Sequence, residues 1–406
     1  MTSPPGRLFG VGIAGPALDP SERAILERLP PRAVILFSRN IETERQLADL
    51  CAEIRSLPGE PLLCVDQEGG RVDRLREIAG PFPSFYEAAR AGLSRRAGEV
   101  AGDACRLFGF GIDLAPVVDR RVPGAGEAVL GDRAAAEDPD RVAEAAREFL
   151  EGLHSRGVGG CLKHFPGLGR ARFDTHLTLP TLPADAGGED RDLAPFRALH
   201  ELAGAVMVSH AASPDNSRPA SLSPDVATRL LRDAVGFRGA TFSDDLEMGA
   251  LAEFGGLPER SAAAMRAGCD LLFVCSRLEE YPECVARVET EVPEDRRAEA
   301  ARRMDGYADR LRGLSAAAPP PRSLDAIAAD VAALKQAAGT GPTALHPPSY
   351  SRSAPASLLG LLTKVRTAHR RRTPPRARRL RSPPWQAPDA WRPSAAAARA
   401  SRRCSP

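Results

Sequence analysis

The segment Lys163-His164-Phe165-Pro166-Gly167-Leu168-Gly169 follows the apolar run 158–162, and it indicates how this chain folds. The apolar run predicts a buried strand, so Lys163 and His164 are expected where that strand ends and a loop begins. Proline fixes one backbone angle and glycine admits unusual ones, which predicts a turn-rich loop rather than a helix after Phe165. Polar side chains are therefore presented at the carboxyl end of a buried strand.

Apolar runs of this kind recur along the chain, and helical patterns separate most of them. Together with the first, the runs are 8–13, 33–37, 61–65, 112–118, 158–162, 205–209, 240–243 and 271–275. The helical patterns are 20–29, opened by Asp19 as N-cap and Pro20, then 42–57, 95–108, 139–153, 192–202, 224–235 and 261–267. Buried strands that alternate with amphipathic helices imply a parallel sheet. Eight such units fit an α/β fold with a single (β/α)8 TIM barrel, and an open doubly wound sheet is the alternative.

Charge divides the chain of 406 residues into two regions, although its net charge is only +2. From residue 331 onward, 15 Lys and Arg face one Asp, a local charge of +14, whereas residues 1–330 hold 40 basic against 52 acidic residues, or −12. From about residue 339, Pro, Ala, Ser and Arg dominate, a composition that cannot bury enough apolar area to fold. We expect a barrel over 1–314, a short linker and helix over 315–338, and a disordered basic tail over 339–406.

Composition also bears on partners and location. The arginine clusters of the tail are compatible with nucleic acid, but we favour an appendage without that role and expect no nucleic-acid partner. We find no apolar run of membrane-spanning length, and the N-terminus lacks the pattern of a signal peptide. The cysteines ahead of the tail lie singly at apolar positions, without metal-type spacing: Cys51, Cys64, Cys105, Cys161, Cys269, Cys275 and Cys284. We therefore expect a cytoplasmic monomer with reduced thiols, no membrane contact, no metal and no cofactor.

Asp174-Thr175-His176, closed by Pro180, follows the opening segment. In an extended segment Asp174 and His176 point to the same side, because they are two residues apart. A carboxylate beside an imidazole fixes its tautomer and raises its basicity, as a general acid/base requires. A solvated loop in which the two side chains bond only locally is the alternative.

Further polar segments follow other apolar runs. After 61–65 comes Asp66-Gln67-Glu68-Gly69-Gly70-Arg71-Val72-Asp73-Arg74, where Asp66 could accept two ligand hydroxyls and Arg74 could clamp an oxygen-rich group. A loop salt bridge is the alternative, and the paired glycines do not have the spacing of a phosphate-binding fingerprint. In Ser243-Asp244-Asp245, a carboxylate ending a buried strand is costly unless it is paired, functional or an N-cap.

Three other polar residues near strand ends receive weaker predictions. Asp113 and Asp119, in the run 111–119, are expected to be structural. His210 follows the run 205–209 and is compatible either with a pocket or with a rim position satisfied by its neighbours.

Taken together, these segments resemble the β-N-acetylhexosaminidase branch of glycoside hydrolase family 3, over about residues 8–312. The family pattern Lys-His-Phe-Pro-Gly-His-Gly, then Asp-Ser/Thr-His and Pro, matches 163–180 except at Leu168, where the family usually has histidine. Segment 66–74 resembles the Asp-Gln-Glu-Gly-Gly-Arg signature, 111–119 resembles an Ala-Pro-Val-x-Asp run, and 237–248 resembles the nucleophile motif Ser-Asp-x-x-x-Met.

The resemblance implies a retaining exo-β-N-acetylglucosaminidase that removes N-acetylglucosamine from cell-wall fragments during peptidoglycan recycling. It assigns Asp244 as the nucleophile and His176, oriented by Asp174, as the acid/base. The residues that it assigns to sugar binding are Asp66, Arg74, Arg133, Lys163 and His164. A β-glucosidase or β-xylosidase type, a phosphorolytic family 3 enzyme and a non-catalytic sugar-binding barrel stay open as alternatives.

Overall fold

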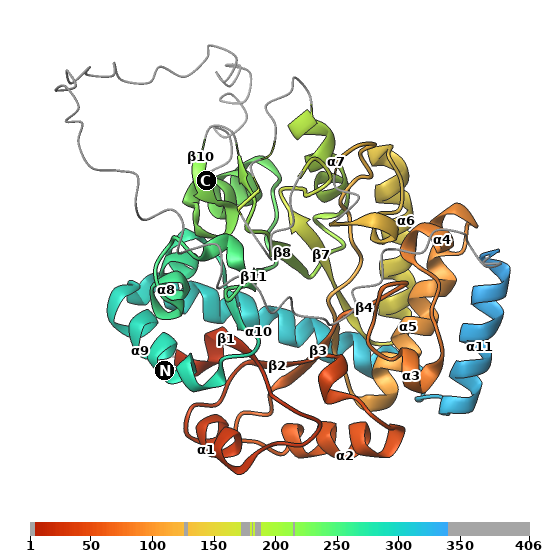
Figure 1. The fold of residues 1–406 in the computed structure, drawn as a ribbon, viewed down its shortest axis with the longest axis horizontal. Helices are drawn as coiled ribbons and strands as arrows, with labels where there is room; N and C mark the ends of the chain where they lie inside the picture. The colour runs from red at the N-terminus through yellow and green to blue at the C-terminus, as the bar shows by residue number, and fades with distance from the viewer. Residues whose placement is uncertain are drawn as a thin grey trace, which may run out of the picture. The chain divides into compact units, whose positions relative to one another are not determined.

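The computed structural model describes residues 5–125, 129–171, 179–180, 182, 188–213 and 216–339, which include a closed barrel of eight parallel strands (Figure 1). In their order around the barrel, the strands are β1 (Phe9–Gly12), β2 (Ala33–Leu36), β3 (Leu62–Val65), β6 (Ile112–Asp113), β7 (Gly159–Phe165), β8 (Ala205–Val208), β11 (Ala240–Asp245) and β12 (Leu271–Val274). Parallel pairing of β1 with β12 closes the ring. The predicted TIM barrel is confirmed, and the open sheet is excluded.

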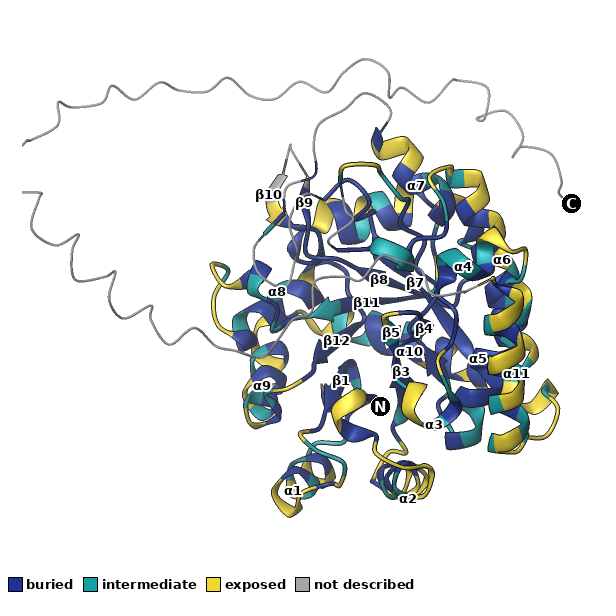
Figure 2. Cartoon of the chain, turned by 45° about the vertical axis from the view of Figure 1, so that its right-hand side comes forward, coloured by how far each residue is buried: buried dark blue, intermediate teal, exposed yellow. Residues whose placement is uncertain are grey.

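Helices cover the outside of the barrel, with buried faces toward the strands and exposed faces outward (Figure 2). They include α1 (Pro20–Arg28), α2 (Glu44–Arg55), α5 (Ser94–Phe108), α6 (Pro139–Ser155), α7 (Gly188–Leu199), the π-helix η5 (Asp225–Ala234), α8 (Leu257–Ala267) and α9 (Tyr281–Glu291). Asp19 caps α1 as predicted, in a capping box with Glu22 that satisfies backbone N–H groups at the helix start. Shorter elements fill the loops: α3 (Arg76–Ala79), α4 (Phe85–Arg90) and the two-stranded sheets β4 (Gln67–Gly69) with β5 (Val72–Asp73) and β9 (Ala212–Ser213) with β10 (Asn216–Pro219).

Two strand ends differ from the prediction. Strand β6 ends at Asp113, not at residue 118, because Pro116 has no N–H to continue the ladder, and beyond it Val117 forms only an isolated bridge. Strand β7 continues past residue 162, since the Val118 N–H donates to the Lys163 carbonyl at 2.8 Å and the Ser209 N–H to that of Phe165 at 2.8 Å. Lys163 and His164 therefore lie inside a strand, where neighbours on both sides fix their backbone.

Helix α10 (Glu294–Ala317) crosses the amino-terminal end of the barrel (Figure 1). Its side chains Met304, Tyr307 and Leu311 are buried in the same apolar cluster as the inward-facing strand residues. The Tyr307 hydroxyl donates to the Gly160 carbonyl at 3.2 Å. Helix α10 thus closes one end of the barrel and leaves the carboxyl ends of the strands as the open end.

Two glycines let α10 approach the strands this closely. A Cβ at Gly159 would lie 2.3 Å from Leu311, and one at Gly204 would lie 2.4 Å from the Tyr307 ring. No side chain larger than hydrogen fits at such distances without movement of the helix.

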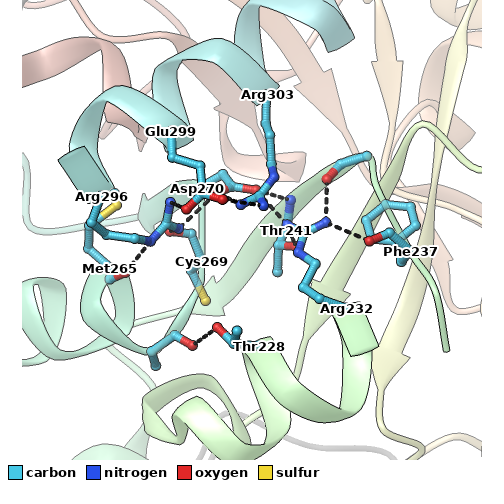
Figure 3. A network of polar contacts seen from close by, with 12 residues as sticks. Thr228, Arg232, Phe237, Thr241, Met265, Cys269, Asp270, Arg296, Glu299 and Arg303 are labelled. Carbon is cyan, nitrogen blue, oxygen red and sulfur yellow. Dashed lines mark hydrogen bonds and ion pairs between the residues drawn. The ribbon is translucent and has the colours of Figure 1, made fainter. Parts of the chain in front are cut away.

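A buried ionic network joins α10 to the strands near this closed end (Figure 3). Asp270, fully buried just before β12, accepts hydrogen bonds from Arg232 at 2.8 Å, Arg296 at 2.8 Å and the Thr241 N–H at 2.9 Å. Arg303 of α10 adds a fourth contact at 3.3 Å. Every oxygen of this carboxylate is satisfied, so the charge is stabilised where water does not reach it.

Helix α11 (Leu324–Ala337) lies against α5 and α3, and it buries Ile327, Val331 and Leu334. It is the short helix that was predicted within 315–338. Helix α10 runs across residue 314 without a break, which is where the barrel was expected to give way to a linker. Residues 340–406 lie outside the described part of the chain, so the expected disorder of the tail stays a prediction.

Candidate active site

One pocket at the carboxyl ends of the strands collects six of the eight predicted site residues. Its polar lining consists of Asp66, Glu68, Arg74, Arg133, Lys163, His164, Asp244 and Asp245. Apolar side chains, among them Phe37, Val129, Leu168 and Met248, form the rest of the wall. Asp66 follows β3, Lys163 and His164 belong to β7, and Asp244 belongs to β11, so separate strands deliver them to one point.

A chain of ion pairs connects the cations of this pocket. The Lys163 Nζ lies 2.7 Å from Asp66 Oδ1 and 2.6 Å from Glu68 Oε1. Arg133 holds both oxygens of Glu68, at 2.7 and 2.9 Å. Burial disfavours the charged form of Glu68, but Arg133 and Lys163 outweigh it and hold the pKa of Glu68 well below its usual range. Burial likewise opposes the charge on Lys163, yet Asp66 and Glu68 raise the pKa of Lys163 above its usual value.

Glu68 was not among the predicted site residues, although it is central to this network. Its spacing of two residues from Asp66 was an available signal, because such residues in an extended segment face the same side. Arg133 was assigned to the site by the family resemblance alone, and its side chain is only 13% exposed. Its paired position fixes it to the pocket wall.

His164 is held in one tautomer by its two neighbours. Its Nδ1 lies 2.7 Å from Asp119 Oδ2, and its Nε2 lies 3.2 Å from the Arg133 Nη2. A guanidinium can only donate, so Nε2 must accept and Nδ1 must carry the proton. We therefore infer a neutral imidazole in this arrangement. Asp119 was expected to be structural, and here it orients a predicted sugar-binding residue.

Leu168 shows why an apolar residue is tolerated where the family usually has histidine. Its backbone N–H makes the polar contact, donating to Asp119 Oδ1 at 2.6 Å. Its side chain is 1% exposed and packs in an apolar cluster with Val117, Val129 and Leu182. The loop is thus anchored through the backbone, and the side chain contributes only an apolar pocket wall.

Asp244 and Asp245 both line the pocket although they are consecutive residues of one strand. Consecutive strand residues normally face opposite sides, but the pairing of β11 with β12 shifts register between Phe242 and Asp245. The Asp245 N–H donates to Asp244 Oδ1 at 2.9 Å. The N-cap alternative does not hold, because the next helical turn, η6 (Gly249–Leu251), begins only after Met248.

Two further groups define the surroundings of this carboxylate pair. Burial, together with the charge of Glu247, raises the pKa of Asp245 to about 7. His210 is fully buried, with Nδ1 2.7 Å from Ser221 Oγ and Nε2 2.8 Å from the Asp245 carbonyl oxygen. His210 therefore supports the end of β11 and does not line the pocket.

Arg74 is a cation of the pocket wall that has hydrogen-bonding capacity left. Its Nη2 lies 3.8 Å from Asp66 Oδ2, and its guanidinium lies 5.7 Å from the centre of the Phe37 ring. Its Nε is buried and has no hydrogen-bond partner among the described residues. A donor in that state is satisfied when an oxygen-rich ligand occupies the pocket.

Asp174 and His176, the predicted acid/base pair, lie outside the described residues. The residues on either side of this segment are described, and they lie beside the pocket. Ala171 and Leu182 belong to the apolar cluster of Leu168, and the Ala212 N–H donates to the Pro180 carbonyl at 2.9 Å. Ala171 and Leu182 thus share an apolar cluster with Leu168, which lines the pocket.

The described ranges contain no group of three or more His, Cys, Asp or Glu side chains placed to hold a metal ion. No helix within them is both long and apolar enough to cross a membrane. The seven cysteines ahead of residue 340 are free and buried, and burial raises the pKa of the pocket thiol Cys275 well above its usual value.

Barrel glycoside hydrolases place their carboxylates at the carboxyl ends of the strands of a (β/α)8 barrel, and this chain gathers carboxylates, cations and an imidazole at that end. Residues 17–337 match the Glycosyl hydrolase family 3 N terminal domain, and the chain belongs to this family.

Relatives and solved structures agree with this assignment. A beta-hexosaminidase of Xanthomonas oryzae is 39% identical over 289 residues, which cover 68% of this chain and 84% of that protein. A family 3 beta-N-acetylglucosaminidase from Paenibacillus superposes with a TM-score of 0.75 at 30% identity, covering 82% of this chain and 68% of that one. NagZ from Neisseria gonorrhoeae, solved with N-trifluoroacetyl-D-glucosamine, has a TM-score of 0.69 at 29% identity, covering 80% and 97%.

Proposed function

We propose that this glycoside hydrolase, a β-N-acetylhexosaminidase by its relatives, is a retaining exo-β-N-acetylglucosaminidase. The observation that carries the proposal is the position of Asp244 in one pocket with the Lys163, Asp66, Glu68 and Arg133 network. A carboxylate at a strand end supplies a nucleophile, and the fixed ions beside it supply hydrogen bonds to sugar hydroxyls.

In the proposed reaction, Asp244 attacks the anomeric carbon and forms a covalent glycosyl-aspartate. His176, oriented by Asp174, protonates the departing oxygen and then takes a proton from the water that hydrolyses the intermediate. An unperturbed imidazole titrates near 6.5, so it both gives and takes a proton near neutral pH. Each displacement inverts the anomeric carbon, and two inversions retain its configuration.

The sugar is held by groups that the pocket already fixes. Asp66 and Glu68 have oxygens that accept from sugar hydroxyls, and Lys163 and Arg74 have donors for sugar oxygens. The neutral His164, whose ring is held in place by Asp119 and Arg133, forms a rigid part of the pocket wall. These groups are buried or half-buried, so their hydrogen bonds to the substrate are little weakened by water.

The choice of N-acetylglucosamine comes from the relatives, since their names specify hexosamine substrates. We extend it to N-acetylglucosamine at the non-reducing end of peptidoglycan fragments, handled in the cytoplasm by a monomer. This extension rests on the family resemblance of the motifs in 66–74, 163–180 and 237–248.

An assay of aryl β-N-acetylglucosaminide against aryl β-glucoside and β-xyloside, each with and without phosphate, tests the substrate and the reaction together. We expect turnover of the N-acetylglucosaminide alone, with product of retained configuration by NMR and no dependence on phosphate. Preferred glucoside turnover would favour the β-glucosidase type, a sugar phosphate product would favour phosphorolysis, and binding without turnover would favour a sugar-binding barrel.

His176→Ala separates acid/base catalysis from simple sugar binding. With a natural sugar alcohol as leaving group, the variant should lose roughly 10²–10⁴-fold in rate, the usual contribution of a positioned acid/base. Nitrophenolate leaves without protonation, so that substrate should give a burst of nitrophenol followed by slow hydrolysis of the intermediate. Equal losses for both leaving groups, with no burst, would assign His176 to binding. Asp174→Asn should show a weaker version of the same pattern.

A further inference from the structure

Asp113, at the end of β6, is a buried carboxyl group that the proposed mechanism does not use. Its exposed fraction is 0%, and it is not one of the residues that line the pocket. Its Oδ1 accepts the Gln67 N–H at 2.9 Å. Its Oδ2 has no hydrogen-bond partner among the described residues, which is costly for a charged carboxylate and much less so for a neutral acid.

The charges that face Asp113 come from three neighbouring elements. Lys163 of β7 is the favourable one, whereas Asp66 after β3 and Glu68 of β4 are repulsive. The Lys163 ammonium is already engaged with both of these carboxylates, at 2.7 and 2.6 Å. The other titratable neighbours are Cys161 of β7, Cys105 of α5 and Tyr307 of α10, and burial raises the pKa of each well above its usual range, which keeps them neutral.

A count of charges shows what an ionised Asp113 would do. The connected network contains three carboxylates, Asp66, Glu68 and Asp119, and three cations, Lys163, Arg74 and Arg133. These pairs balance without Asp113, and the pocket carboxylate Asp244 lies outside them. An ionised Asp113 would add an uncompensated negative charge in a water-free position, and it would draw the Lys163 ammonium away from the pocket.

We propose that Asp113 is a neutral carboxylic acid in the working enzyme and serves as a positioning residue for the sugar-binding network. By accepting the Gln67 N–H it fixes the backbone between Asp66 and Glu68, so that both carboxylates face Lys163. By remaining uncharged it leaves the Lys163 ammonium to them. Burial also favours the uncharged form, since it raises the pKa of Asp113 well above its usual range. The role in sugar binding rests on the proposed function, whereas the neutral state does not.

The neutral state predicts an unusual dependence of stability on pH. An ordinary Asp in the unfolded chain loses its proton near pH 3.9, whereas folded Asp113 keeps it to a higher pH. Between these two values the folded state binds more protons than the unfolded state, so the stability of the wild type falls as pH rises. Asp113→Asn keeps a carbonyl oxygen for the Gln67 N–H and has no proton to lose. Its melting temperature should exceed that of the wild type at pH 7, by on the order of 5 °C, and the difference should shrink toward pH 4.

Asp103→Asn is the matched control. Asp103 of α5 is also buried, but it is ion-paired, with Arg322 at 3.1 Å and Arg156 at 3.8 Å. Removing its charge deletes one of the two carboxylate partners of each arginine, since only Asp330 remains for Arg322 and Glu99 for Arg156, so this variant should melt below the wild type at pH 7. If Asp113→Asn behaved in the same way, Asp113 would be an ionised partner of Lys163 and the proposal would be wrong.

Kinetics on an aryl β-N-acetylglucosaminide test the positioning role. Asp113→Asn should keep KM and kcat within about threefold, while Asp113→Ala, which loses the acceptor for Gln67, should raise KM about tenfold with a smaller change in kcat. A KM for Asp113→Asn as high as that for Asp113→Ala would overturn the role assigned to the Gln67 contact. If the wild type did not act on this substrate, the proposed function would fail, but the melting series would still decide the state of Asp113.

Discussion

Both ends of the barrel contain buried charged groups, but the two ends differ in whether every buried polar atom has a hydrogen-bond partner. At the closed end, Asp270 receives Arg232, Arg296, Arg303 and the Thr241 N–H, and both of its oxygens are satisfied (Figure 3). At the open end, the ion pairs of Lys163 and Arg133 border a pocket, and the buried Nε of the pocket residue Arg74 has no partner within the described ranges. One network is complete, and the other has capacity for a ligand.

The difference follows from what covers each end. Helix α10 closes the amino-terminal end with Met304, Tyr307 and Leu311, so a polar group there must find its partners within the protein. The carboxyl ends of the strands are followed by loops, which leave a pocket that substrate can enter. The buried charged groups at the closed end therefore stabilise the fold, whereas those at the open end are placed to contact a ligand.

The sharpest test of this contrast is Asp244→Asn. The change conserves volume and removes the proposed nucleophile, so turnover should fall at least about 10⁴-fold while the melting temperature stays nearly unchanged. Steady-state kinetics and thermal denaturation on the same preparation measure both. Asp245→Asn should lose far less activity. A larger loss for Asp245→Asn would move the nucleophile to Asp245.

Asp270→Asn should give the reverse result at the closed end. It leaves three arginines facing a neutral amide, which should lower the free energy of unfolding by about 3–5 kcal/mol without a change in KM. Urea denaturation and kinetics below the transition separate the two effects. Asp309→Asn is the control on the same helix, because its pair with Arg312 is exposed and should contribute less than about 1 kcal/mol. A raised KM in Asp270→Asn would show that the two ends are coupled.

The strands of the barrel were predictable because each is a continuous apolar run. Strand β2 (Ala33–Leu36), for example, is buried on both faces, as expected for a parallel sheet covered by helices. Helices α9 and α10 were not predicted. The buried stripe of α10 is narrow, with Met304, Tyr307 and Leu311 among many charged residues, and it is buried only because distant strands form a ring above it. Such a signal depends on the tertiary fold and is weak in the local sequence.

The site was predictable to the extent that strand ends mark it. Asp66, Lys163 and Asp244 were located from their positions after or within apolar runs, and the structure brings them to one pocket. The spacing of Glu68 from Asp66 indicated its side, but the contacts of Glu68 with Lys163 and of Asp119 with His164 could not be predicted, because each joins residues that are distant in sequence. The roles of Asp174 and His176 stay predictions.

A change in pH should distinguish the two ends further. Burial raises the pKa of Asp245 to about 7, whereas burial at the closed end lowers the pKa of Arg232 only to about 10. Folded Asp245 keeps a proton that the unfolded chain loses near pH 3.9, so the wild type loses stability as pH rises from about 4 through 7. Asp245→Asn should be more stable than the wild type above pH 7, by on the order of 4 kcal/mol, and equal to it near pH 4. Urea titrations between pH 4 and 8.5 measure this, and an equal gap at both limits would contradict it.

The smallest effect is expected from removing residues 340–406. We assign no part of either network to this region, since the residues of both lie between 66 and 303. The truncated protein should therefore keep its KM, kcat and melting temperature within experimental error. A loss of activity alone would place the tail at the open end, and a loss of stability alone would place it on the body of the barrel.

A second truncation, from residue 323 onward, provides the comparison that makes this result interpretable. It also removes α11, whose side chains Ile327, Val331 and Leu334 are buried against the barrel body, and it breaks the ion pair of Lys335 with Glu87. Losing three buried aliphatic side chains should lower the free energy of unfolding by several kcal/mol, at about 1.5–3 kcal/mol for each. The active pocket does not include α11, so KM should change little at temperatures where the shorter protein stays folded. If both truncations destabilised the protein equally, the stabilising contacts would lie beyond residue 339, and the fold would not be complete within the residues described.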